Sequence, residues 1–115
     1  MKYLHIIYKM QIAGISIRSV DVARELGVTK ASVSRMVKLL EGMGFIAMEK
    51  YSEITLTNKG QNEGAAIHEK IMQIYPFFAD YLELEEPEAI HNAYSFLGSF
   101  SENCVEQLVC KGWAI

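Results

Sequence analysis

A short stretch near position 30 carries side chains whose types and spacing suit contact with duplex DNA. Ala31, Ser32 and Ser34 are small, whereas Arg35 and Lys38 are long and cationic. Small residues let a helix approach base edges, and arginine or lysine can bind guanine edges and phosphates. A solvated helix face with ordinary charges is the alternative interpretation. The residues that we assign to DNA contact are Thr29, Lys30, Ser32, Ser34, Arg35, Lys38, Lys50 and Tyr51.

Two short helices joined by a tight turn would position these side chains. We expect the first helix over 20–26, capped by Ser19 and closed by Gly27. The second is expected over 30–42, capped by Thr29. This arrangement, with a polar and basic outer face on the second helix, is typical of a helix-turn-helix. The inner face of the second helix consists of apolar residues at helical spacing: Val33, Met36, Val37 and Leu40.

The flanking segments predict a winged helix. We expect an opening helix over 2–12, and residues 15–18 could form a small edge strand. Residues 45–50 and 54–57 predict a β-hairpin whose tip carries Tyr51 beside Lys50. Such a wing could contact the DNA backbone through its tip, although a plain solvent-exposed turn fits almost as well.

The second half of the chain predicts three helices rich in aromatic residues. A long helix over 59–75, capped by Thr57 or Asn58, should kink or restart at Pro76. After an acidic turn, Pro87 should lie in the first turn of a helix that Gly98 interrupts.

Ser101 is expected to cap the last helix. The aromatic residues supply more apolar surface than a few short helices can bury, which favours a dimer interface; a compact core within one subunit is the alternative. The residues that we assign to dimerisation are Tyr94, Leu97, Phe100, Val105 and Leu108.

The two halves of the chain also differ in net charge. Residues 1–60 hold nine Lys/Arg and five Asp/Glu, a net charge of +4, whereas residues 61–115 hold two and nine, a net charge of −7. We therefore expect a mainly α protein with two domains, a winged helix-turn-helix domain at 1–60 and a helical dimerisation domain at 61–115. No apolar run approaches the length of a membrane span, and no signal-peptide pattern opens the chain, so we expect a cytoplasmic protein.

Several sequence motifs together resemble the diphtheria-toxin-repressor and manganese-transport-regulator (DtxR/MntR) family over roughly residues 2–109. They are YLxxIY at 3–8, VDVARELGVT at 20–29, SVSRMVKLL at 32–40, GFI at 44–46, LTNKG at 56–60 and SExxVExL at 101–108. The resemblance implies a homodimeric transcriptional regulator, with Ser32, Ser34 and Arg35 at groove-contacting positions. It also implies a pseudo-palindromic operator, because a two-fold dimer reads two half-sites.

The resemblance further implies a Mn(II) or Fe(II) site, but this chain lacks its ligands. The family's ligand positions fall on Lys2, His5, Ile71, Tyr75, Tyr94, Leu97 and Gly98. A one-residue shift in the last segment gives Ser95, Gly98 and Ser99, which are no better. Hard divalent cations need several oxygen or imidazole donors converging on one point. We therefore expect no metal cofactor and a regulator without the family's metal switch.

Two other functions stay open. One is a winged-helix module that binds an acidic partner protein. The other is a regulator whose metal or redox sensor has moved to His5, His91, Cys104 or Cys110, although the cysteines fit better as small buried hydrophobic residues. An enzyme is not expected, because the chain carries no nucleophile–base pairing and no phosphate-binding loop.

Overall fold

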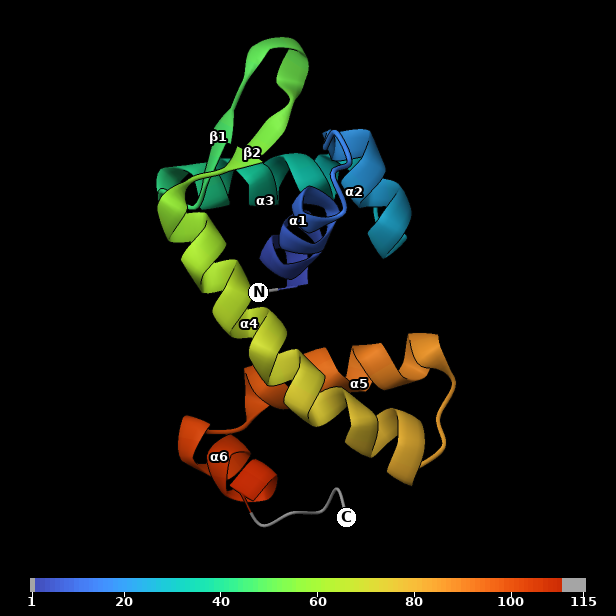
Figure 1. Cartoon of the computed structure of the whole chain (residues 1–115). Helices are drawn as coiled ribbons and strands as arrows, with labels where there is room; N and C mark the ends of the chain where they lie inside the picture. Colours follow the sequence, from blue (N-terminus) through green and yellow to red (C-terminus); the bar gives the residue numbers. More distant parts are fainter. Residues whose placement is uncertain (1, 111–115) are drawn as a thin grey trace. The chain divides into compact units, whose positions relative to one another are not determined.

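The computed structural model describes residues 2–110, and they form two compact units (Figure 1). One unit comprises residues 2–66, and the other begins at Ile67. Met1 and residues 111–115, which include the end of the second predicted domain, lie outside the described residues. The fold is mainly helical with one two-stranded sheet, as the sequence predicts.

Three helices and a hairpin build the N-terminal unit. The helices are α1 (Lys2–Ile12), α2 (Ser19–Leu26) and α3 (Lys30–Gly42), and the bounds of α1 and α3 are those predicted from sequence. Helices α2 and α3 pack against each other, and α1 packs against α2. Their shared core consists of aliphatic side chains that are at most 5% exposed: Leu4, Ile7, Ile17, Val22, Val33, Val37, Leu40, Ile46 and Ile54.

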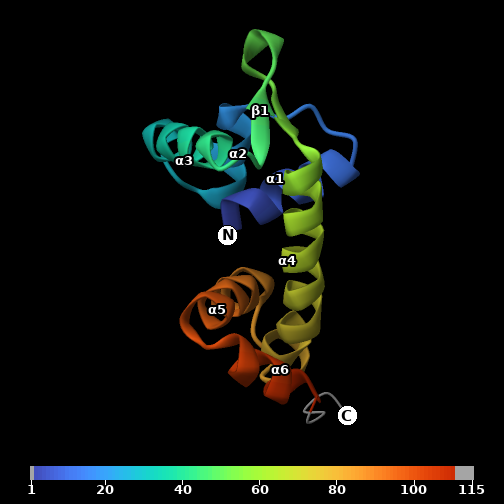
Figure 2. The ribbon, with the colours of Figure 1, turned by 90° about the vertical axis from the view of Figure 1, so that its left-hand side faces the viewer.

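The hairpin is antiparallel and follows α3 directly. Strand β1 (Ile46–Met48) pairs with β2 (Ile54–Leu56) in the register that places Ala47 opposite Thr55. Strand β1 packs on α3 and β2 packs on α1. Both views show the loop of the hairpin extending beyond the three helices (Figures 1 and 2), so the predicted wing is confirmed.

Two local predictions before α2 are wrong. Residues 15–18 do not form a strand: the Ile17 carbonyl accepts one hydrogen bond from Ile54 N (2.8 Å), but the next outward amide of β2, Leu56 N, bonds to the Gln11 side chain instead (3.1 Å). The cap of α2 is Arg18 and not Ser19, because the carboxylate of Asp21 accepts a hydrogen bond from Arg18 N (3.1 Å) and starts the helix one residue early.

Two glycines let α4 (Asn58–Pro76) pack closely against the rest of the N-terminal unit. Thr57 Oγ1 caps the helix by accepting a hydrogen bond from Gly60 N (3.0 Å). A Cβ atom on Gly60 would lie 1.8 Å from the Phe45 carbonyl oxygen, and one on Gly64 would lie 2.8 Å from the Tyr8 side chain. The LTNKG motif therefore has a structural reason: only glycine fits where the helix leaves the hairpin.

The C-terminal unit contains the second half of α4, a π-helical turn at Phe77–Tyr81, and helices α5 (Glu86–Ser99) and α6 (Glu102–Cys110). The α-helix ends at Pro76 and Pro87 lies in the first turn of α5, as predicted. Gly98 does not interrupt α5, which continues to Ser99 and ends where Phe100 becomes extended. Ser101 caps α6 as expected, accepting a hydrogen bond from Cys104 N (3.1 Å). The buried residues of this unit are Ile67, Ile71, Ile74, Ala89, Ala93 and Val105.

Candidate nucleic-acid interface

The face of α3 opposite its buried residues is exposed, small and basic. Lys30, Ser34, Arg35 and Lys38 are exposed, and Ser32 is half-buried. The helix has this orientation because Val33, Val37 and Leu40 repeat at helical spacing and are buried. The assigned α3 residues therefore lie on one accessible surface of the N-terminal unit.

A short chain of hydrogen bonds orders the N-terminal end of this surface. Thr29 Oγ1 accepts a bond from Ser32 N (3.1 Å), which caps α3, and Thr29 Oγ1 donates to Ser32 Oγ (3.0 Å). Arg35 Nη2 in turn donates to Ser32 Oγ (3.4 Å). These contacts tie the exposed Arg35 guanidinium to the first turn of the helix, and its other N–H groups can still donate to a ligand.

The turn before α3 sets the angle between the two helices. Gly27 has φ +66°, a backbone conformation that residues with a Cβ rarely adopt. Val28 N closes the turn by donating to the Ala23 carbonyl (3.1 Å). Only Gly27 and Val28 separate α2 from the Thr29 cap, which is the tight turn that a helix-turn-helix needs.

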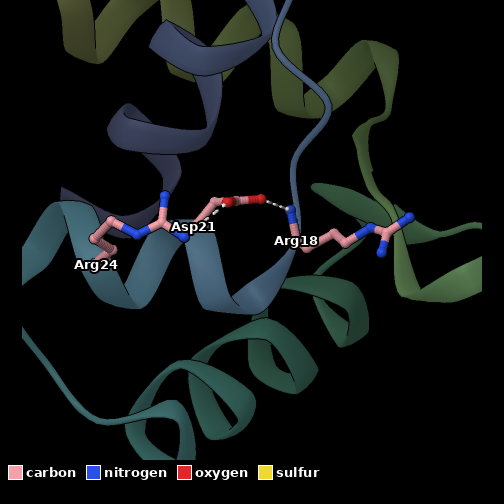
Figure 3. A network of polar contacts seen from close by, with 3 residues as sticks. All are labelled: Arg18, Asp21 and Arg24. Carbon is pink, nitrogen blue, oxygen red and sulfur yellow. Dashed lines mark hydrogen bonds and ion pairs between the residues drawn. The ribbon is translucent and has the colours of Figure 1, made fainter.

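Arg18 is an exposed cation close to α2 that is not among the residues predicted to contact DNA. Arg18 donates its backbone N–H to Asp21, while its guanidinium points away from that carboxylate (Figure 3). Arg24, in contrast, forms an ion pair with Asp21 at 3.6 Å. A basic residue directly before a short helix could have indicated this position. The sequence analysis instead expects residues 15–18 to form a strand and Ser19 to cap the helix.

The wing tip is exposed, as predicted for Lys50 and Tyr51. Tyr51 is 84% exposed, more than any other large hydrophobic residue described. The two carboxylates of the wing are held by neighbouring hydroxyl groups: Ser16 Oγ donates to Glu53 (2.7 Å), and Thr55 Oγ1 donates to Glu49 (3.3 Å).

The residues assigned to dimerisation differ in burial. Phe100 is 53% exposed and stacks on Phe96 with ring centroids 4.5 Å apart. Val105 is 7% exposed and belongs to the core of its own unit. Tyr94, Leu97 and Leu108 are half-buried. Burial also raises the pKa of the Tyr94 phenol from 10.0 to about 12.

The family's ligand positions do not make a metal site in this chain. Ile71 is 2% exposed in the core of the C-terminal unit, and Leu97 and Gly98 offer no side-chain donor. His5 is 1% exposed, among the apolar residues of α1. Within residues 2–110, no three His, Cys, Asp or Glu side chains gather where they could hold a metal ion. These residues do not fit Mn(II) or Fe(II).

The cysteines are not buried, contrary to prediction. Cys104 and Cys110 are both free and exposed, because Val105, Leu108 and Val109 form the inner face of α6. His91 is also exposed, and His68 is half-buried. In the described part of the chain, no helix is long and apolar enough to cross a membrane.

Comparison with known proteins finds a DNA-binding domain family and HTH-type transcriptional regulators. Residues 2–54 match the model of the iron dependent repressor, N-terminal DNA binding domain. The chain is 32% identical over 92 residues to an uncharacterized HTH-type transcriptional regulator, MJ0568, of Methanocaldococcus jannaschii, covering 80% of this chain and 74% of that protein. It is 32% identical over 74 residues to the HTH-type transcriptional regulator MntR of Lysinibacillus sphaericus, covering 63% of this chain and 50% of that one.

Solved structures share the fold. The manganese regulator SloR matches with a TM-score of 0.79 and 28% identity, over 93% of this chain and 50% of SloR. IdeR of T. acidophilum matches with a TM-score of 0.77 over 98% of this chain and 53% of IdeR; at 17% identity this likeness concerns the fold alone. The chain spans about half the length of these two proteins and of MntR.

Proposed function

Because the chain belongs to the DtxR/MntR family of HTH-type transcriptional regulators and is not an enzyme, we propose that it binds a pseudo-palindromic DNA operator as a homodimer and represses transcription in the cytoplasm. Helix α3 would enter the major groove, with Ser32, Ser34 and Arg35 facing base edges. Lys30 and Lys38 would bind phosphates at its two sides.

The observation that carries this proposal is the ordered outer face of α3. Its arginine is held by the Thr29–Ser32 hydrogen bonds. A guanidinium held in this way loses less side-chain entropy when it binds a base edge than a free one. The excess of positive charge in residues 1–60 would also favour association with a polyanion such as DNA.

We further propose that binding does not require the family's metal. The support is chemical: Lys2, Ile71, Leu97 and Gly98 replace donors that a divalent cation needs. A protonated lysine at the first of these positions would repel a cation.

Selection of DNA from a random duplex library tests both proposals. The full chain should enrich one sequence with two related half-sites, and its affinity should fall steeply between low and moderate salt. Added Mn(II) or Fe(II) should leave the enriched sequence and its affinity unchanged, with a metal-dependent family member as positive control.

The possible results test the operator, the protein-interaction alternative and the independence from metal separately. Enrichment of no sequence would refute the operator proposal, and recovery of a protein but no DNA from a cell extract would favour the protein-interaction alternative. A dissociation constant that drops on addition of metal would refute the metal-independent mechanism while leaving DNA binding intact.

A further inference from the structure

The tip of the wing has an unusual backbone. Tyr51 and Ser52 follow each other with φ +61° each, in the left-handed region. Two consecutive residues with positive φ are what a type I′ hairpin turn requires, and Asn-Gly is the sequence that satisfies it at least cost. A residue with a Cβ is disfavoured in this conformation. The chain therefore places a tyrosine where hairpins ordinarily use a small or flexible residue.

The surrounding contacts fix this turn. Glu49 N donates to the Glu53 carbonyl (2.7 Å), and Glu53 N donates weakly to the Lys50 carbonyl (3.4 Å). The side chain of Glu53 is tied to Ser16, and that of Glu49 to Thr55. Both carboxylates are thus bonded to residues outside the turn, while Tyr51 remains 84% exposed in it.

The charge of the wing does not suit phosphate binding. Residues 45–57 contain one cation, Lys50, and two anions, Glu49 and Glu53, which gives a net charge of −1. Contacts that neutralise phosphates come from lysine and arginine, and a segment with this balance gains little from them. A neutral aromatic ring, in contrast, gains by covering apolar parts of its ligand.

We infer that the wing binds duplex DNA through the ring of Tyr51, laid against the apolar surface of deoxyribose, and that the strained turn presents this ring at the end of the wing. The inference rests on the proposed DNA binding and specifies which contact the wing makes. The ionic contacts are left to α3.

Fluorescence anisotropy with a labelled duplex of the selected sequence tests the inference, using the full chain over a series of salt concentrations. Tyr51→Asn tolerates the turn but removes the ring, and it should weaken binding about tenfold at every salt concentration. Its plot of log affinity against log salt should keep the wild-type slope. Lys38→Ala, the ionic comparison, should reduce that slope by about 1. Tyr51→Phe keeps the ring and should bind like the wild type.

A second variant tests the strain without removing the ring. Ser52→Gly should raise the melting temperature of the chain by about 4 °C, because glycine adopts a positive φ without the steric cost of a Cβ. It should preserve DNA affinity, because the Tyr51 ring is unchanged. An unchanged melting temperature would show that the turn is not strained and would overturn that part of the inference.

The remaining outcomes separate the two proposals. If Tyr51→Asn binds like the wild type or flattens the salt slope, or if Tyr51→Phe binds as weakly as Tyr51→Asn, the ring contact is wrong while DNA binding stands. If the wild-type chain binds no duplex, the proposed function itself fails.

Discussion

At the scale of single residues, the chemistry of the candidate interface depends on how Arg35 is held. Its guanidinium donates to Ser32 Oγ, which is itself fixed by the Thr29 cap. The same cap therefore begins the helix and orders the side chain that we expect to read bases. Arg24 carries an equal charge but is paired with Asp21.

We expect Arg35→Ala to weaken binding to the selected operator by about 1–3 kcal/mol, the usual worth of a bidentate base contact. Binding to unrelated duplexes should weaken much less, and competition gel shifts measure both. Arg24→Ala is the matched control, since it removes the same charge from an arginine that is already paired. Equal losses for the two variants would mean that Arg35 contributes charge alone.

The half-buried Tyr94 phenol makes the stability of the protein sensitive to alkali. Its pKa is raised by burial to about 12, from 10.0 when unfolded, so folding favours the neutral form. The resulting stabilisation is complete below pH 10 and is lost as the pH rises from 10 to 12.

Thermal melting at a series of pH values should therefore show a loss of stability in this window for the wild type. Tyr94→Phe, which cannot ionise, should show a smaller loss there. Identical pH profiles for the two proteins would contradict the assignment to Tyr94. Ultraviolet titration gives an independent readout, in which the ionisation of Tyr94 near pH 12 should be missing from Tyr94→Phe.

At the scale of elements, the connection from the hairpin to α4 is held by several side-chain hydrogen bonds. Besides the Thr57 cap, Thr57 Oγ1 donates to the Gly44 carbonyl (2.6 Å), and Lys59 Nζ donates to the Met43 carbonyl (2.8 Å). The Lys59 ammonium also lies 4.8 Å from the Phe45 ring centroid. The start of α4 thus binds carbonyl groups directly after α3, so α3, the hairpin and the first turn of α4 are held together.

We expect Gly60→Ala to destabilise the chain by about 1–3 kcal/mol, because its methyl group would meet the Phe45 carbonyl. Gly42→Ala in α3 is the control: its Cβ would meet nothing within 4 Å, and helix propensity should make it stabilising by about 0.5 kcal/mol. Urea unfolding at constant m value measures both. A Gly60→Ala protein as stable as the wild type would show that α4 can move away from the hairpin without cost.

At the scale of the whole molecule, the chain joins two units that differ in charge and surface. Residues 2–66 hold nine Lys/Arg and six Asp/Glu, a net charge of +3, whereas residues 67–115 hold two and eight, a net charge of −6. The C-terminal unit also exposes large apolar side chains, among them Tyr81 (68%), Met72 (55%) and Phe100 (53%). Exposed apolar surface of this kind is what the proposed homodimer would cover.

We expect Phe100→Glu to disrupt the proposed dimer, leaving a monomer of 13.0 kDa, and to weaken operator binding, because a monomer engages only one half-site. Sedimentation velocity gives the mass. Asn62→Glu adds the same charge at an exposed position of the N-terminal unit and should remain dimeric. A wild-type chain that sediments as a monomer at every concentration would refute the dimer.

Much of this fold could be predicted from the sequence because its signals are local. Apolar residues at helical spacing placed α1 and α3 at their observed bounds, and Thr29, Ser101 and Gly27 marked helix ends through their own side chains or lack of one. The outer face of α3 followed from the same periodicity. The expected residues of the interface therefore needed no tertiary information.

Other features were decided only by tertiary contacts between residues distant in the chain. Gln11 takes the β2 amide that a strand at 15–18 would have needed, 45 residues away, so that strand does not form. The requirement for Gly60 comes from the Phe45 carbonyl, and the exposure of Cys104 from which face of α6 is buried. The sequence by itself determined where the helices lie and which α3 residues face outward, since caps and periodicity act over a few residues. The fold decided how the wing is held, since Ser16 Oγ donates to the Glu53 carboxylate 37 residues away and Ile54 N donates to the Ile17 carbonyl, and these bonds form only once the hairpin has packed.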